Sequence, residues 1–166
     1  MRKMAFAVAL IVLTAVPSVA SAGGKPTRSP TGNSPFDFPA GIVCSFEVAG
    51  QPLVDNEVTK TFPPLPNGDV VQTISGSLIL QLQNVENGKS ITLNVSGPGT
   101  ITTHPDGSQT VIDRGRSLSF FFPTDSPAGP ATYLYTGQVV LNFTPDGQQI
   151  LVRQTGTSED ICAALA

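Results

Sequence analysis

Two runs of alternating apolar residues flank Asn87-Gly88, and this pattern constrains the fold more than any other feature of the chain. Asn-Gly between such runs predicts a β-hairpin, because both central positions of a type I′ turn need a positive φ. With these two residues as the loop, the numbers of opposed residues sum to 175. The ribbon would run from Val70 to Thr103 and bury one face. Its expected pairs are Leu82 with Leu93, Leu80 with Val95, Ile74 with Ile101, and Gly76 with Gly99.

The last part of the chain shows the same pattern around Asp146-Gly147. With that loop the numbers of opposed residues sum to 293, so Gly137 faces Gly156. Glycine weakens a strand, so two glycines opposed in mid-strand predict a bend or a close approach of two backbones. Closed and strongly coiled sheets use glycine in this way. The expected apolar pairs are Phe143 with Ile150 and Leu141 with Val152.

Three turns of the form Pro-Asp-Gly or Pro-Asn-Gly recur along the chain, beginning at Pro66, Pro105 and Pro145. Proline presets its own φ and glycine supplies a positive φ, so each triplet predicts a turn. The steps of 39 and 40 residues between them fit hairpins that repeat in up-and-down order.

The segments before the central hairpin are less regular. Residues 42–48 alternate as a strand that points Cys44 toward the core, and Gly50-Gln51 then predicts a turn. A strand from Leu53 to Phe62 follows, interrupted at Asp55-Asn56.

After the central hairpin, the alternation from Gln109 to Phe122 would point Arg114 and Arg116 inward together with apolar residues. Either Gly115 forms a bulge that turns both arginines outward, or the interior there is polar; we favour the bulge. Residues 124–130 predict a loop, and residues 157–165 predict a short helix that begins with a capping and acidic turn.

Together these patterns predict an all-β protein of seven or eight antiparallel strands in up-and-down order, with a short C-terminal helical turn. No strand pair is separated by enough helix for a parallel crossover. A small antiparallel β-barrel is the first choice and a β-sandwich is the alternative, because both use the same alternation.

The N-terminus predicts a secretory signal peptide over residues 1–22, with a charged start, an apolar segment and Ala20-Ser21-Ala22 as cleavage site. Residues 23–35 predict a flexible leader, and residues 36–166 a single all-β domain. The mature chain would be a secreted protein without a membrane span. It would carry seven Lys/Arg against twelve Asp/Glu, a net charge of −5, and this acidity argues against nucleic acid as a partner.

The chain has two cysteines, Cys44 and Cys162. In an oxidising compartment we expect them to form a disulfide, which places the two ends of the domain side by side. A catalytic thiol is the less favoured alternative, because no motif links the only histidine to either cysteine.

The inventory of catalytic and metal-binding motifs is thin, so we predict no catalytic residue, no metal and no cofactor. His104 stands beside a turn and is expected to be a solvated polar residue. Nothing selects a pair of carboxylates for acid–base chemistry. The aspartates that could bind calcium lack the required spacing and are expected to be turn residues; they are Asp106, Asp113, Asp125 and Asp146.

The aromatic residues of neighbouring strands are the candidate ligand site. They predict either a packed aromatic core or a cavity for a small apolar molecule. The candidate lining residues are Phe120, Phe122, Tyr133 and Tyr135. Arg114 and Arg116 would suit an anionic head group if they faced inward.

Four segments carry a resemblance to a known group: F-D-F-P-A-G-I-V-C-S-F at 36–46, N-V-S-G-P-G at 94–99, L-Y-T-G-Q-V-V at 134–140 and T-G-T-S-E-D-I-C-A-A-L at 155–165. In these the chain resembles exported actinobacterial proteins of unknown function. The resemblance implies bacterial export and supports the pair Cys44–Cys162. It implies no activity, ligand or catalytic residue.

Three hypotheses for function follow. The first, which we favour, is a secreted binding or interaction module whose ligand could be a small apolar molecule. The second is a cofactor-free barrel enzyme that isomerises or cyclises an apolar substrate. The third is a structural protein of the cell envelope. A cavity with an open mouth favours the first two, and converging acids inside it favour the second.

Overall fold

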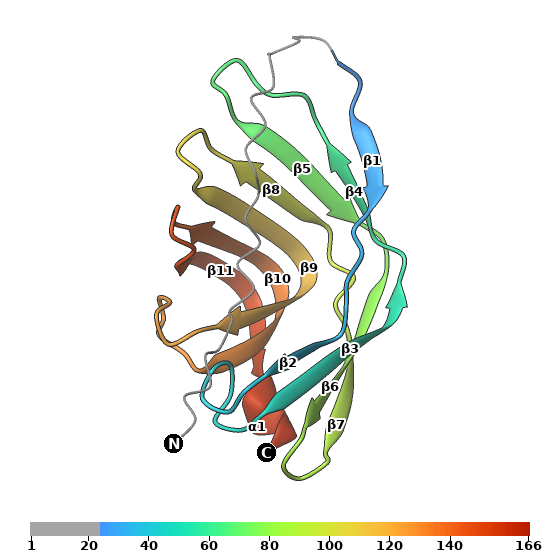
Figure 1. Cartoon of the computed structure of the whole chain (residues 1–166), viewed down its shortest axis with the longest axis vertical. Coiled ribbons are helices and arrows are strands. Elements are labelled where there is room, and N and C mark those ends of the chain that lie inside the picture. Colours follow the sequence, from blue (N-terminus) through green and yellow to red (C-terminus); the bar gives the residue numbers. More distant parts are fainter. Residues whose placement is uncertain (1–23) are drawn as a thin grey trace, which may run out of the picture.

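The computed structural model describes residues 24–166, and the predicted signal peptide lies outside the described part (Figure 1). This part of the chain is all-β with one short C-terminal helix, as predicted, but residues 157–160, expected to form the first turn of that helix, belong to the last strand. The elements are β1 (Thr27–Pro30), β2 (Phe36–Phe38), β3 (Val48–Asp55), β4 (Val58–Thr61), β5 (Val70–Ser75), β6 (Leu78–Asn84), β7 (Ser90–Asn94), β8 (Gly99–Thr103), β9 (Gln109–Phe121), β10 (Ala131–Phe143), β11 (Gln149–Asp160) and α1 (Ile161–Leu165).

The strands form two antiparallel sheets. The seven-stranded sheet has the order β1-β4-β5-β8-β9-β10-β11, and the four-stranded sheet has the order β2-β3-β6-β7. In the seven-stranded sheet β1 and β11 are unpaired edges, so the sheet does not close on itself. The closed barrel expected from the sequence is therefore not formed. The predicted leader also contributes to the fold, since Thr27–Pro30 pairs with β4.

Four stretches of chain pass from one sheet into the other, and this explains why eleven strands form where seven or eight were expected. Each stretch is a long strand that breaks in the middle: β1 and β2, β3 and β4, β5 and β6, and β7 and β8. The break between β3 and β4 falls at Asn56-Glu57, next to the interruption seen in the sequence. The central ribbon breaks at Gly76-Ser77 and again at residues 95–98.

The central hairpin forms, but its register differs from the prediction by two residues. Leu80 pairs with Leu93 and Ile74 with Gly99, so the numbers of opposed residues sum to 173. The side chain of Asn84 accepts from the N–H of Glu86 and so favours a loop longer than two residues. Because side chains alternate with a period of two, this shift keeps the predicted face. The expected pair Gly76–Gly99 is wrong.

The C-terminal hairpin has the predicted mid-strand register and a different turn. Gly137 pairs with Gly156 as expected, while Leu141 pairs with Leu151 rather than Val152. A register shift between Val140 and Leu141 accounts for the difference. In Figure 1, β9, β10 and β11 curve strongly along their length.

All three predicted turns form, each as a three-residue loop with the same hydrogen bonds. The residue before the proline donates its N–H to the carbonyl after the glycine, at 2.8 Å for Leu65 to Asp69 and 2.9 Å for both His104 to Ser108 and Thr144 to Gln148. The turns lie along one end of the seven-stranded sheet (Figure 1).

Two local predictions near the N-terminus are wrong. Residues 42–47 form turns and bends rather than a strand, although Cys44 is buried as expected. Gly50-Gln51 is not a turn and lies within β3. Gly50 pairs with Phe36, whose ring occupies the space that a side chain at residue 50 would fill. An aromatic ring that packs over a glycine compensates for its missing side chain, so the glycine can remain within a strand.

The core has two parts. The larger part lies between the sheets and includes Val43, Leu82 and Leu134, with Ile161 and Leu165 of α1. The smaller part is formed by Phe121 of β9 and by Tyr135, Val139 and Leu141 of β10, and Leu151 of β11 packs against it.

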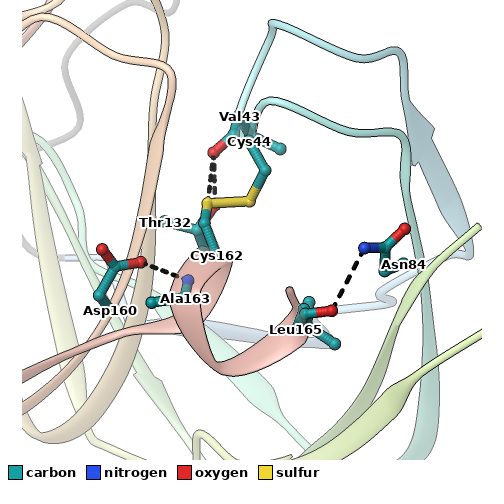
Figure 2. The surroundings of a disulfide bond; sticks show 8 residues. All are labelled: Val43, Cys44, Asn84, Thr132, Asp160, Cys162, Ala163 and Leu165. Atoms are coloured by element: carbon teal, nitrogen blue, oxygen red, sulfur yellow. Dashed lines mark hydrogen bonds between the residues drawn. A yellow bond between two sulfur atoms is a disulfide. The ribbon is translucent and has the colours of Figure 1, made fainter. Parts of the chain in front are cut away.

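The disulfide joins Cys44 to Cys162 as predicted, with a Cα–Cα distance of 5.5 Å (Figure 2). It attaches α1 to the irregular segment before β3. Asp160 caps α1 by accepting from the N–H of Ala163 at 3.0 Å, and Asn84 donates to the carbonyl of Leu165 at 3.2 Å. The disulfide thus joins the two ends of the domain, and a hydrogen bond from β6 holds the end of α1.

Candidate functional site

A partly open cavity of about 290 Å³ lies where the long strands break and pass between the sheets. Strand pairing is interrupted at these breaks, and the side chains around them line the cavity. Its apolar wall consists of Phe36, Ile74, Leu78, Leu80, Val95, Leu118 and Phe120. Its polar wall consists of Thr31, Asn33, Ser34, Glu57, Asp113 and Ser117.

Two carboxyl groups converge on this cavity from different strands. Glu57 lies in the break between β3 and β4 and is 8% exposed. Asp113 lies on β9 directly opposite Gly99, and its Oδ1 lies 2.8 Å from the position that a Cβ on Gly99 would take. The missing side chain at residue 99 therefore makes room for the Asp113 carboxyl group.

The two acids differ in their hydrogen bonds. Asn33 donates through Nδ2 to Glu57 at 3.0 Å and to Asp55 at 3.2 Å, so it bridges these two carboxylates. Asp55 also accepts from the backbone N–H groups of Asn33 and Glu57. Within residues 24–166, Asp113 makes no side-chain hydrogen bond to the protein. Its acceptor oxygens are available to a ligand.

Burial sets the charge state of the cavity. It raises the pKa of Asp113 to about 6, and the negative charge of Glu57 adds to this effect. Burial also raises the pKa of Glu57, against the hydrogen bond from Asn33. The pKa of Asp55, outside the cavity, is lowered, mainly by the backbone hydrogen bond from Asn33. The apolar wall thus makes two negative charges costly, which a bound proton or cation relieves.

Four phenylalanines form one continuous aromatic cluster at the edge of the cavity. Phe38 lies 5.1 Å from Phe120 and 5.8 Å from Phe122, measured between ring centroids. Phe36 contacts both Phe38 and Phe120. Only Phe36 and Phe120 reach the cavity, and Phe122 is 37% exposed.

The other predicted ligand residues do not join this cavity. Tyr133 and Tyr135 pack with Phe121 in the smaller core. Arg114 and Arg116 are exposed, so neither faces the interior. Toward β8, the N–H of Arg114 donates to the carbonyl of Pro98 and the carbonyl of Arg116 accepts from the N–H of Gly97. Toward β10, Gly115 pairs with Gly137 in an unbroken register. Of the six candidates, the structure brings only Phe120 into the cavity and Phe122 near it.

Sequence reasoning missed both cavity acids. Asp113 was expected in a turn, and it lies within β9. The sequence did carry a signal: burying a carboxylate without a partner is costly, so an aspartate within a predicted strand indicates a possible site. Glu57 lies at the break that the sequence did indicate. Only the pairing of β8 with β9 and the crossing of the sheets bring the two acids to one cavity.

Comparison with known proteins found no matching family model, no matching curated protein and no matching solved structure. In residues 24–166, no three or more His, Cys, Asp or Glu side chains are grouped so as to hold a metal ion. No helix in the same range is long and apolar enough to span a membrane.

We expect the stability of the protein to fall as the pH rises through the range in which Asp113 ionises. The pKa of Asp113 is about 6 in the folded protein against 3.8 ordinarily, so the folded state binds more protons between these values. Asp113→Asn should therefore be more stable than wild type at pH 8, by about 1–2 kcal/mol once solvent screening is allowed for.

Urea unfolding at pH 8 and at pH 3.5 checks this expectation. The difference between Asp113→Asn and wild type should shrink toward zero at the lower pH, where both carry a neutral group. Asp37→Asn, at an exposed acid of β2 outside the cavity, is the matched control for replacing a carboxylate with an amide. The expectation is wrong if wild type gains stability relative to Asp113→Asn as the pH rises from 4 to 7.

Proposed function

We propose that this protein is a secreted small-molecule binding protein and that its two sheets form an open β-sandwich around the binding cavity. The ligand we infer is a compact organic cation, such as a protonated amine with an apolar body. The observation that carries the proposal is the Asp113 carboxyl group, which faces an apolar cavity beside Glu57 without a hydrogen-bond partner in the described chain.

The size and lining of the cavity support a small ligand. Ligand pockets usually measure about 300–1,000 Å³ and combine an apolar wall with a few polar groups that orient the ligand. A cavity of about 290 Å³ lies just below this range and so suits a small ligand. Phe36 and Phe120 offer aromatic faces, which attract both apolar groups and cations.

The charges in the cavity support a cation over an anion. A protonated amine could donate to Asp113 and relieve its repulsion with Glu57 in one step. An anion would add a third negative charge, and the arginines predicted to receive one are exposed outside the cavity. Disulfide formation between Cys44 and Cys162 supports export to an oxidising compartment.

Isothermal titration calorimetry with three ligands of similar shape tests this proposal. Cyclohexylamine, cyclohexanol and cyclohexanecarboxylate differ mainly in charge. At pH 8 the amine should bind more tightly than the alcohol, and the carboxylate should not bind. A charge-assisted hydrogen bond contributes about 1.5–3 kcal/mol, so Asp113→Asn should weaken amine binding by about 10- to 100-fold.

The pH and a second variant provide the controls. Binding of the amine should weaken at pH 5, where Asp113 is mostly protonated. Asp37→Asn should leave binding unchanged. Equal affinity for the amine and the alcohol, or unchanged binding by Asp113→Asn, would refute the cation proposal.

Acid–base catalysis on a small apolar substrate is the second candidate, because the same cavity holds two acids of raised pKa. A carboxyl group with a pKa of about 6 can give and take a proton near neutral pH. Exchange of the α-protons of cyclohexanone with D₂O, followed by NMR, tests this candidate. Wild type should accelerate the exchange and Asp113→Asn should not; amine binding without any acceleration favours the binding protein. The cell-envelope role stays a prediction.

A further inference from the structure

A second polar site lies at the end of the seven-stranded sheet, away from the cavity between the sheets. Nδ1 of His104 lies 3.0 Å from Oδ1 of Asp69, and Nε2 of His104 lies 3.0 Å from Oγ1 of Thr110. Asp69 directly precedes β5, His104 directly follows β8, and Thr110 lies at the start of β9. Carboxylate, imidazole and hydroxyl group therefore form one chain of hydrogen bonds, the arrangement of a nucleophile, a base and a residue that orients the base.

The hydrogen bonds fix the direction in which a proton would move. An ionised carboxylate only accepts, so Asp69 holds the proton on Nδ1 of a neutral His104. Nε2 is then an acceptor, and the Thr110 hydroxyl group donates to it. Asn67 donates to the other oxygen of Asp69 at 2.8 Å and so orients the carboxylate. The hydrogen bond from His104 is the main reason why the pKa of Asp69 is lowered, which keeps it ionised.

The same site has room for a substrate. His104 and Thr110 line a surface hollow of about 250 Å³ together with Asn142, Phe143 and Ile150. Asn142 lies directly opposite Thr110 on β10, and Ile150 lies directly opposite Asn142 on β11. Directly opposed residues point to the same face at about 5 Å between Cβ atoms. In the described part of the chain the Asn142 side chain makes no hydrogen bond, so its amide can donate to a substrate oxygen.

We infer that Thr110, His104 and Asp69 form a hydrolytic site for small carboxylic esters. Oγ1 of Thr110 would attack the ester carbonyl carbon while Nε2 of His104 takes the hydroxyl proton. The C–O bond to the alcohol then breaks, and His104 passes its proton to the leaving oxygen. Water attacks the acyl-threonine with His104 again as base, which releases the carboxylic acid and restores the hydroxyl group. Asn142 would stabilise the oxyanion, and Asp69 is a positioning residue.

p-Nitrophenyl acetate is the probe for this inference, read by nitrophenol release and by peptide mass spectrometry of the acetylated chain. Wild type should release nitrophenol and carry an acetyl group on Thr110. Thr110→Val, which keeps the shape of the side chain, should lose the adduct and at least about 100-fold of the rate. Thr110→Ser should retain activity. Circular dichroism and thermal unfolding of each variant show that it is folded.

The matched control is Thr102→Val, because Thr102 lies opposite Thr110 on β8 and makes no side-chain hydrogen bond to His104 in residues 24–166. This variant should keep the wild-type rate. Asp69→Asn should lower kcat with little change in KM, and Asp69→Glu, which keeps a carboxylate, should recover part of the rate; a purely structural residue would give neither result. Acetylation of His104 alone, or equal rates for wild type and Thr110→Val, would overturn the inference. The cavity between the sheets is unaffected by these variants, so either proposal can fail alone.

Discussion

Replacing Cys44 and Cys162 together with alanine should lower the free energy of unfolding by about 4 kcal/mol, the entropy that closing so long a loop removes from the unfolded chain. The disulfide joins residues 118 positions apart and so restricts nearly the whole domain. The five-residue helix α1 depends on it as well, because so short a helix is not stable alone. Loss of the bond would let α1 leave the core at Ile161 and Leu165.

Urea unfolding of the oxidised wild type, the reduced wild type and the double alanine variant measures this effect. The two proteins without the bond should unfold at similar urea concentrations, well below that of the oxidised protein. Asp160→Ala removes only the N-cap of α1 and should cost about 1 kcal/mol. A loss as small as that of Asp160→Ala for the double variant would show that the disulfide does not hold the domain together.

Gly137→Ala should destabilise the protein by about 3 kcal/mol or more, among the largest effects of a single substitution. Gly137 has a φ of +134°, which L side chains rarely adopt. A Cβ there would also overlap the backbone carbonyl of Thr155 on β11. Its partner Gly156 has a φ of +85°, and a Cβ there would overlap the carbonyl of Thr136. The strongly curved part of the seven-stranded sheet has no room for a side chain at this pair.

Gly147→Ala is the matched control for the glycine prediction, since Gly147 has a φ of +90° but nothing within 4 Å of its missing Cβ. The free energy of unfolding of that variant should fall by only about 1–2 kcal/mol, the cost of placing an L residue in the left-handed region. Thermal unfolding of both variants separates the two contributions. If they lose the same stability, the close approach of β10 and β11 is not what requires glycine.

The hairpins were predictable because the information for them is local. Alternation and turn residues located all three turns and the pair Gly137–Gly156. The register of the central hairpin shifted by two because Asn84 closes a longer loop with its own side chain, a choice that alternation does not reveal. The strand break at Asn56-Glu57 was visible, whereas its consequence, the crossing into a second sheet, was not.

The candidate sites were less predictable, because each combines residues that are far apart in the sequence. Phe120 was identified from its aromatic neighbours, but Asp113 was taken for a turn residue and His104 for a solvated one. Asp113 becomes part of a site only through the pairing of β8 with β9 and the break at Glu57. His104 becomes part of one only when the turn before β5 brings Asp69 beside it.

By itself, the sequence determined that this chain is all-β, that its strands are antiparallel and joined by tight turns, and that Cys44 pairs with Cys162. Alternation and turn residues are enough for the strands because they act over a short range, and two cysteines in an oxidising compartment favour a single disulfide. Only the tertiary structure decided that long strands divide between two sheets and that an open cavity forms where they cross. That outcome depends on how both sheets bury their apolar faces at once, a balance that no single segment contains.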